Sequence, residues 1–389
     1  MPSIDKPESD PVERAREIIE FGLTADDLGP RRVEVEPARL ADLGLPWPEG
    51  LAPQPQPLEV EPGTADRLPS ADVLVVTWTV AEVEALADTL TPGFSRRNWY
   101  RYDRFFDTRY RPQIRRGAPA LSVNRLGSYF PTRIGDKTVL CVKSELHLNQ
   151  DGIATGEGTA TLPVADLFRQ MIDEVGPSLV ITVGTAGATF GDHELGDVII
   201  TRAARFRLSQ EFRNEPFNGK TYVCDLTVPQ SRLAAARPLL ALHKDRLIEP
   251  DFGPPTKRYP FDQPLIPGPR PDPDFKIDGR DFDAFLPMLT TDFFEFGTST
   301  NELWRIGCGV EMGDAVLGMV VEELEQAGQQ APRWLVIRNA SDPQINGDLP
   351  DTPRALNMQA HWAVWYYETY GYWTSVNSAL ATWAMIADD

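Results

Sequence analysis

Cysteine is scarce in this chain of 389 residues, and the three that occur, Cys141, Cys224 and Cys308, are widely spaced and form no CxxC pair. A disulfide framework and a zinc ribbon both need more cysteines at closer spacing, so we expect neither. Positive charge is also in deficit, because 38 Lys and Arg residues stand against 57 Asp and Glu residues and the net charge is −19. That charge argues against nucleic-acid polymers and anionic membranes as partners, while it does not exclude a small anionic ligand in one pocket.

Long apolar runs are missing as well. The first residues, MPSIDKPESDPVERAREIIEF, contain no apolar signal-peptide core, and no later run approaches the length of a membrane span. We therefore expect a cytoplasmic protein without nucleic-acid or membrane partners. Proline, in contrast, is abundant at 35 residues, gathered mainly before residue 70 and between 250 and 273. Because proline is excluded from helix interiors, residues 1–70 are predicted to form an extended N-terminal extension, and the cluster at 250–273 is predicted to lie in an excursion, about 207–287, within a folded domain over 71–389.

Between the proline clusters, apolar runs typical of buried strands alternate with amphipathic helical segments. Strands are predicted at 71–78, 137–144, 178–187, 197–206 and 333–342, and helices at 80–90, 162–175, 310–328 and 355–387. This alternation predicts an α/β fold with a largely parallel sheet. Because ligands of such sheets bind beyond the carboxyl ends of the strands, the segments 77–82, 144–158, 184–187 and 339–344 are where a site is expected.

Two of these strand ends carry residues suited to a ligand site. One ends in Gly184-Thr185-Ala186-Gly187, where a ligand can approach the backbone closely, although a plain tight turn has the same pattern. The other ends in Ser341-Asp342, and an Asp in that position is placed to become a partly desolvated acid. Asp342 equally suits the cap of a following helix, with Pro343 in its first turn.

Taken in order, three segments resemble the purine nucleoside phosphorylase and nucleosidase superfamily. They are VGTAGATFGDHELGDVIITRAARF, VEMGDAVLGMVVEELEQAG and WLVIRNASD, similar to a G-[ST]-A-G strand end, a GD-[IV]-[IV] strand, a VEM-E helix start and an R-x-[IV]-SD strand end. The segment VVTWTVAEVEAL also resembles the opening of methylthioadenosine/adenosylhomocysteine nucleosidases. The resemblance covers roughly residues 71–387, with the excursion at 207–287 outside it. It implies a three-layer nucleoside-phosphorylase-like fold with a mixed, mostly parallel sheet flanked by helices, a homo-oligomer, and no metal or organic cofactor.

The resemblance also implies a reaction, which is cleavage of the N-glycosidic bond of a purine nucleoside or a derivative. Asp342 is implied as the acid that protonates the leaving base, and Glu82 as the carboxylate that activates water. Read from its position alone, Glu82 is also an ordinary first-turn residue favoured by the helix dipole. Phe293 or Phe294 is expected to stack on the base, with Asp292 as its neighbour. Further substrate contacts are implied for Ser144, Ala186, Gly187, Glu311, Met312, Asp314 and Ser341.

Two departures from the family pattern bear on the substrate. Gly313 replaces the Glu that follows VEM and binds the ribose hydroxyls in the family, which leaves Asp314 as the nearest carboxylate. The family's SG-[IM]-G loop is replaced by residues 144–152, in which His147 is a candidate contact to the sugar or to an anion. The proline-rich additions lie outside the shared motifs, so we expect them to set substrate specificity or assembly.

Two alternatives to a nucleosidase remain at this point. The first is a phosphate-dependent phosphorylase, in which phosphate would be held by one of Arg96, Arg97, Arg101 and Arg104. The first strand ends in Thr77-Trp78-Thr79 and lacks the Gly-Asp turn and Arg of phosphorylases, which favours water as the nucleophile. The second alternative, motivated by Gly313, is a non-catalytic nucleoside-binding or regulatory module.

Overall fold

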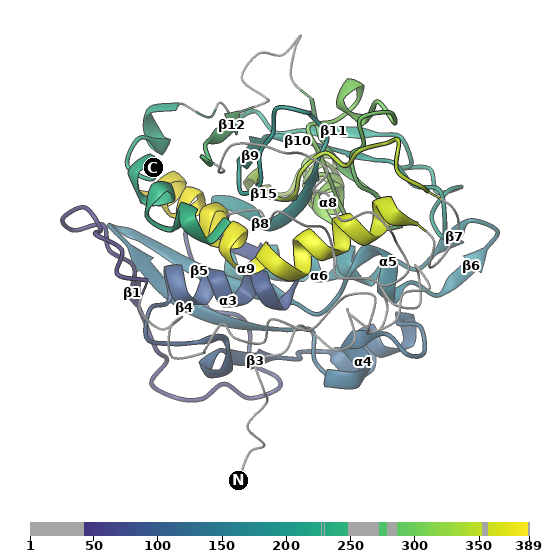
Figure 1. The fold of residues 1–389 in the computed structure, drawn as a ribbon. Coiled ribbons are helices and arrows are strands. Elements are labelled where there is room, and N and C mark those ends of the chain that lie inside the picture. The colour runs from purple at the N-terminus through teal and green to yellow at the C-terminus, as the bar shows by residue number, and fades with distance from the viewer. Residues whose placement is uncertain are drawn as a thin grey trace.

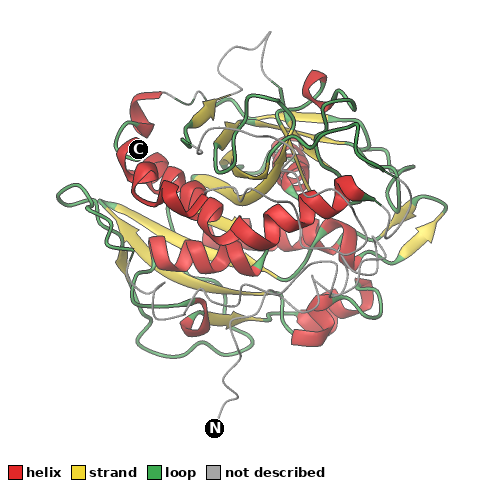
Figure 2. Cartoon of the chain, viewed as in Figure 1, coloured by secondary structure: helices red, strands yellow, loops and turns green. Residues whose placement is uncertain are grey.

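The computed structural model describes residues 43–226, 228, 230–247, 272–277, 286–351 and 357–387. Within these residues, thirteen strands join one mixed sheet that is flanked by helices (Figures 1 and 2). The α/β fold that the alternation of strands and helices predicted is therefore confirmed.

The centre of the sheet consists of four parallel strands. In spatial order they are β5 (Lys137–Ser144), β2 (Val73–Thr77), β8 (Leu179–Ala188) and β15 (Arg333–Asp342). Nearly every residue of β2, β8 and β15 is buried, because helices cover both faces of the sheet. Such strands consist of unbroken apolar runs, which is why the sequence predicted each of them within a residue or two. Their carboxyl ends meet at one edge of the sheet.

Antiparallel borders enclose this parallel centre on both sides. Beside β5 lie β4 (Gly127–Ile134), β3 (Tyr100–Tyr102) and β1 (Gln54–Pro55). Beyond β8 and β15 lie β9 (Val198–Thr201), β12 (Phe275–Ile277), β14 (Gly309–Glu311), β13 (Met288–Thr290), β10 (Ala203–Phe206) and β11 (Thr221–Val223). A separate hairpin consists of β6 (Ala154–Gly156) and β7 (Thr159–Ala160). The centre thus meets its neighbours through antiparallel pairs, whereas β12 pairs with β9, and β13 with β10 and β14, in parallel.

Helices cover the sheet in two pairs. On one face, α3 (Val80–Leu90) packs against α9 (Met358–Ala387), and on the other α6 (Pro163–Val175) packs against α8 (Asp314–Gln326) (Figure 1). The short helices are α4 (Pro119–Val123), α5 (Leu148–Asp151) and α7 (Arg237–Leu240). In the described part of the chain, no helix combines the length and the apolarity needed to cross a membrane.

Two predicted elements differ from the structure. The single strand expected over 197–206 divides at Arg202 into β9 and β10, because β9 pairs with β15 whereas β10 pairs with β13. The helix expected over 310–328 begins as the strand β14, and α8 starts only at Asp314. In both cases a pairing partner far along the chain decides the conformation, and local spacing does not reveal it.

The described part of the predicted N-terminal extension, residues 43–70, lies against the domain as an extended strap. The Trp47 ring lies 4.7 Å from that of Trp383 on α9, and the indole N–H of Trp383 donates to the carbonyl of Leu51 at 2.7 Å. The strand β1 then pairs with β4. Residues 1–42 and most of the second proline cluster lie outside the described residues, so the role of these additions stays a prediction.

Candidate functional site

A pocket opens at the carboxyl ends of the central strands, at the edge of the sheet where the sequence predicted a ligand site. It encloses about 960 Å³ of space, the opening to solvent included. Its lining residues are Trp78, Thr79, Glu82, His147, Asn149, Gln150, Thr185, Ala186, Gly187, Thr291, Phe294, Glu295, Val310, Glu311, Met312, Gly313, Arg338, Ser341, Asp342 and Tyr367.

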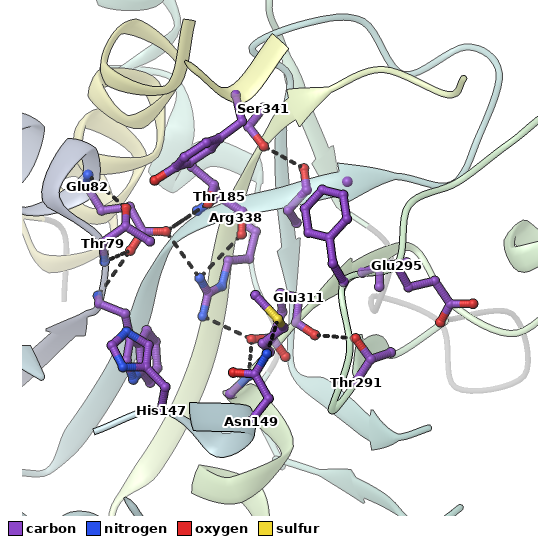
Figure 3. A pocket seen from close by; sticks show the side chains of 18 of the residues that line it. Thr79, Glu82, His147, Asn149, Thr185, Thr291, Glu295, Glu311, Arg338 and Ser341 are labelled. Carbon is purple, nitrogen blue, oxygen red and sulfur yellow. Dashed lines mark hydrogen bonds and ion pairs between the residues drawn. The ribbon is translucent and has the colours of Figure 1, made fainter. Parts of the chain in front are cut away.

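A buried arginine, Arg338 on β15, organises one side of this pocket. Its guanidinium donates to Asp314 at 2.6 and 3.0 Å and to Glu311 at 3.3 Å, and it lies 3.7 Å from Glu82. Figure 3 shows Arg338 between Glu82 and Glu311. Its fourth neighbour is the Trp78 ring, whose centroid lies 5.0 Å from the guanidinium carbon. Three buried carboxyl groups thus share a single positive charge.

This imbalance of charge is reflected in the protonation of Glu311. Burial raises the pKa of Glu311 to about 8, the negative charge of Asp314 adds to this, and Arg338 offsets it only in part. The Glu311 carboxyl is held in place by Thr290 and by the backbone N–H groups of Gly313 and Asp314. A proton retained on Glu311 lowers the cost of burying three acids around one guanidinium.

Glu82 in the first turn of α3 is the most fully hydrogen-bonded of these acids. One oxygen accepts from the backbone N–H and the hydroxyl of Thr185, at 2.7 and 2.9 Å. The other accepts from the hydroxyl of Thr77 and from the backbone N–H groups of Trp78 and Thr79, with Thr79 forming a capping box. Burial alone would raise the pKa of Glu82, but Arg338 and these backbone donors outweigh it, so the pKa is lowered. Glu82 is therefore a fixed anion.

Asp342 at the end of β15 is bound in a very different way. Its Oδ1 accepts from the Ser341 hydroxyl at 3.0 Å, whereas its buried Oδ2 has no hydrogen-bond partner among the described residues. Burial raises the pKa of Asp342 to about 7, and the single bond from Ser341 offsets little of that rise. A Cβ on Gly187 would lie 2.9 Å from Oδ2, so the glycine leaves room beside this oxygen. Asp342 is thus a buried carboxyl that can hold a proton near neutral pH.

The aromatic wall of the pocket is Phe294. It lies in a loop, because β13 ends at Thr290 and the following residues form no strand. Phe294 and Glu295 line the pocket, while the Phe293 ring lies off the pocket wall, 6.0 Å from the Arg207 guanidinium. Burial raises the pKa of Glu295 to about 7 despite its ion pair with Arg207 at 2.6 Å.

Besides Phe293, three residues expected to contact substrate do not line the pocket. Asp292 accepts hydrogen bonds from the backbone N–H groups of residues 209, 210 and 212, and so anchors that loop instead of facing a base. Ser144 closes a local turn by bonding with the backbone of Leu146. Asp314 is completely buried beneath Arg338. The remaining expected contacts do line it: His147, Ala186, Gly187, Phe294, Glu311, Met312 and Ser341, together with Glu82 and Asp342.

Several wall residues were not singled out from the sequence. Arg338 was visible as the first residue of the R-x-[IV]-SD pattern, but no role was assigned to it. Thr185 lay within the glycine-rich strand end, and Trp78 directly follows β2. Tyr367 projects from the long helix α9, whose even spread of aromatic residues gives no signal of which one faces a ligand.

The four arginines considered as a phosphate site lie elsewhere. None of Arg96, Arg97, Arg101 and Arg104, all in the described part of the chain, lines the pocket. Arg96 pairs with Glu84, Arg101 with Asp103, and Arg104 with Glu174.

Comparisons with known proteins find similarity in structure only. No family model matches the sequence, and no curated protein sequence matches it. Similar solved structures include a 5'-methylthioadenosine/S-adenosylhomocysteine nucleosidase from Neisseria meningitidis, at 13% identity over 82% of this chain and 99% of that one, with a TM-score of 0.42. An S-adenosylhomocysteine nucleosidase from Streptococcus pyogenes has 12% identity, coverage of 82% and 98%, and a TM-score of 0.43. Futalosine hydrolase of Helicobacter pylori has 10% identity, coverage of 80% and 96%, and a TM-score of 0.40. These overlaps are loose, so the roles of residues in this chain rest on their own contacts.

Proposed function

We propose that this protein is a nucleosidase that hydrolyses the N-glycosidic bond of a purine nucleoside or a close derivative. The observation that carries the proposal is Asp342, a buried carboxyl with a pKa raised to about 7 and an unpartnered oxygen in the described pocket. Breaking the bond between C1′ and the base nitrogen sends the electron pair to the base, which must be protonated to leave readily. Asp342 supplies that proton, and Phe294 offers the stacking surface for the base.

The opposite side of the pocket suits the sugar, which becomes positively charged as the base leaves. Glu82 and Glu311 line that side, and a third acid, Asp314, lies just behind it. The fixed negative charge of Glu82 stabilises an oxocarbenium-like transition state without any rearrangement of the protein. Because Arg338 is shared among the three acids, the field on this side is negative or neutral.

The same distribution of charge favours water over phosphate as the nucleophile. Among the described residues that line the pocket, Arg338 is the one guanidinium or ammonium group, and carboxyl groups already occupy it. A phosphate ion would enter a wall rich in acids and find no cation free to hold it. This argument weighs against the phosphorylase alternative.

Thr185 provides a path for the proton that the attacking water releases. Its hydroxyl lines the pocket and donates to Glu82 at 2.9 Å. A water molecule bound at Thr185 can pass a proton to the hydroxyl oxygen while the hydroxyl proton moves to Glu82. This relay gives Glu82 the role of base although its own oxygens are occupied, and the water oxygen bonds to C1′ to complete the hydrolysis.

Incubation with purine nucleosides, with and without phosphate, tests the proposal. We expect free base and free sugar to appear in phosphate-free buffer, with no increase when phosphate is added. A strict need for phosphate, with a sugar 1-phosphate as the product, would identify a phosphorylase instead. Tight binding of nucleosides without any release of base under either condition would identify a non-catalytic binding module.

A further inference from the structure

The wall that would face the sugar is formed by an indole in place of an acidic side chain. Trp78 follows β2 and lines the pocket together with Gly313. A Cβ on Gly313 would lie 3.1 Å from Cζ2 of Trp78, which is closer than such atoms normally approach. Any larger residue at 313 therefore has to displace the indole.

Trp78 is fixed in this position from three sides. Its Nε1–H donates to the carbonyl of Leu146 at 3.1 Å, Arg338 lies over its ring, and Phe168 meets it in an edge contact at 6.2 Å. A buried tryptophan with its single polar atom satisfied does not move aside readily. The space beside Gly313 is thus occupied by the indole.

The acids on this side have no oxygen to offer to a sugar. Both oxygens of Glu82 accept at least two hydrogen bonds, and so do both oxygens of Glu311. The oxygens of Asp314 are bound to Arg338, away from the pocket wall. A carboxylate that grips a vicinal diol needs two oxygens free to accept, and none of these three acids meets that condition.

We infer that the pocket recognises the sugar through the indole of Trp78, so that 2′-deoxynucleosides are hydrolysed at least as fast as ribonucleosides. The inference rests on the proposed function and names its substrate class. An enzyme that binds a hydroxyl rejects substrates lacking it, because its polar groups are left unpaired, and no such penalty arises from these three acids. A 2′-hydroxyl also withdraws electrons from C1′, so the deoxy sugar forms a cation more readily when no hydrogen bond compensates.

Two matched pairs of substrates test this inference on the unaltered protein: adenosine with 2′-deoxyadenosine, and inosine with 2′-deoxyinosine. The measurement is kcat/KM for release of free base. We expect the ratio of deoxynucleoside to ribonucleoside to be one or greater in at least one pair. Base release with a preference of tenfold or more for the ribonucleoside in both pairs overturns the inference and leaves the proposed function standing. No base release from any of the four substrates overturns the proposed function, and the inference with it.

Variants then assign the effect to Trp78. The double variant Trp78→Ala with Gly313→Glu supplies a carboxylate and the space to hold it. We expect its ratio of kcat/KM values to shift at least tenfold toward the ribonucleoside. The matched control is Trp78→Ala alone, which opens the same space without a carboxylate and is expected to keep the ratio at one or above. If the ratio shifts as far toward the ribonucleoside in Trp78→Ala alone as in the double variant, Trp78 acts only through its shape, and the inferred absence of a hydroxyl-binding acid is wrong. If the ratio is unchanged in both variants, the indole does not face the sugar.

Discussion

The two sides of the pocket bury acidic groups in opposite ways. On what we call the Arg338 side, which comprises Arg338, Glu82, Glu311 and Asp314, the carboxyl oxygens are covered by hydrogen bonds and ion pairs. On the Asp342 side, which comprises Asp342, Ser341, Gly187 and Phe294, a carboxyl of equal burial has one partner for its two oxygens. The acids on the two sides are buried alike, but they differ in the number of hydrogen-bond donors that reach them.

The difference explains why similar acids have dissimilar chemistry. Donors that surround Glu82 lower its pKa, whereas their absence leaves burial to raise that of Asp342 to about 7. An acid surrounded by donors is held in one position, while an under-partnered one can exchange a proton directly with a bound ligand. The Arg338 side therefore fits an electrostatic role, with Glu82 reached by a proton only through Thr185, and the Asp342 side fits direct proton transfer.

The sharpest test of this comparison is Asp342→Asn. The amide keeps the shape but cannot protonate a leaving base, so we expect kcat/KM for base release to fall by about 10²- to 10⁴-fold. The matched control is Asp88→Asn in α3, because burial also raises the pKa of Asp88 to about 7, although it contacts Tyr372 outside the pocket. A similar loss of activity in both variants would mean that the effect does not come from the site.

The Arg338 side is tested by removing its single cation. In Arg338→Met, three buried acids lose their shared partner, and we expect the free energy of unfolding to drop by about 3–5 kcal/mol. Chemical denaturation measures this change. Arg333→Met at the exposed start of the same strand is the control and should shift stability by less than about 0.5 kcal/mol. Equal effects at both positions would contradict the view that the Arg338 side is held together by charge.

Thr185→Val probes the connection between Glu82 and the pocket. The variant keeps the volume of the side chain but loses the hydroxyl that donates to Glu82, so we expect kcat to fall roughly ten- to hundredfold with little change in KM. Thr182→Val on the same strand removes a buried hydroxyl that has no hydrogen-bond partner among the described residues, and it should leave kcat unchanged. An unchanged kcat in Thr185→Val would exclude the relay.

The last test is the pH dependence of stability, to which Asp342 and Glu82 contribute with opposite sign. Asp342 has a pKa raised from 3.8 to about 7, so its contribution to stability is complete at low pH and is lost as the pH rises through about 7. The pKa of Glu82 is lowered from 4.5, so its contribution is present above that value and is lost as the pH falls.

Comparing the unaltered protein with Asp342→Asn isolates the contribution of Asp342 to the pH dependence of stability. The stability of the unaltered protein relative to the variant should decline by on the order of 1 kcal/mol per pH unit between about pH 4 and about pH 7, and stay constant above. Denaturant titrations across that range measure the decline. A difference that does not vary with pH would show that Asp342 titrates normally in the folded protein.

The sequence alone determined the central sheet and the edge at which the pocket opens. Long apolar runs specify strands buried on both faces, and the capping residues Thr79 and Glu82 specify the start of α3, which begins at the predicted residue. Asp342 and Gly187 were also identified from their places at strand ends. These features depend on residues close together in the chain, and their patterns of polarity and spacing are local.

Only the tertiary structure decided which acids share Arg338, that Asp292 anchors a loop, that Phe294 faces the pocket in place of Phe293, and that Trp78 fills the space beside Gly313. Each of these outcomes joins segments that lie far apart in the chain, as Glu82 and Thr185 do. Whether a buried carboxyl is saturated or left with a free oxygen depends on how many donors the folded chain brings to it. A sequence supplies the carboxyl, and only packing sets that number, and with it the pKa and the chemistry.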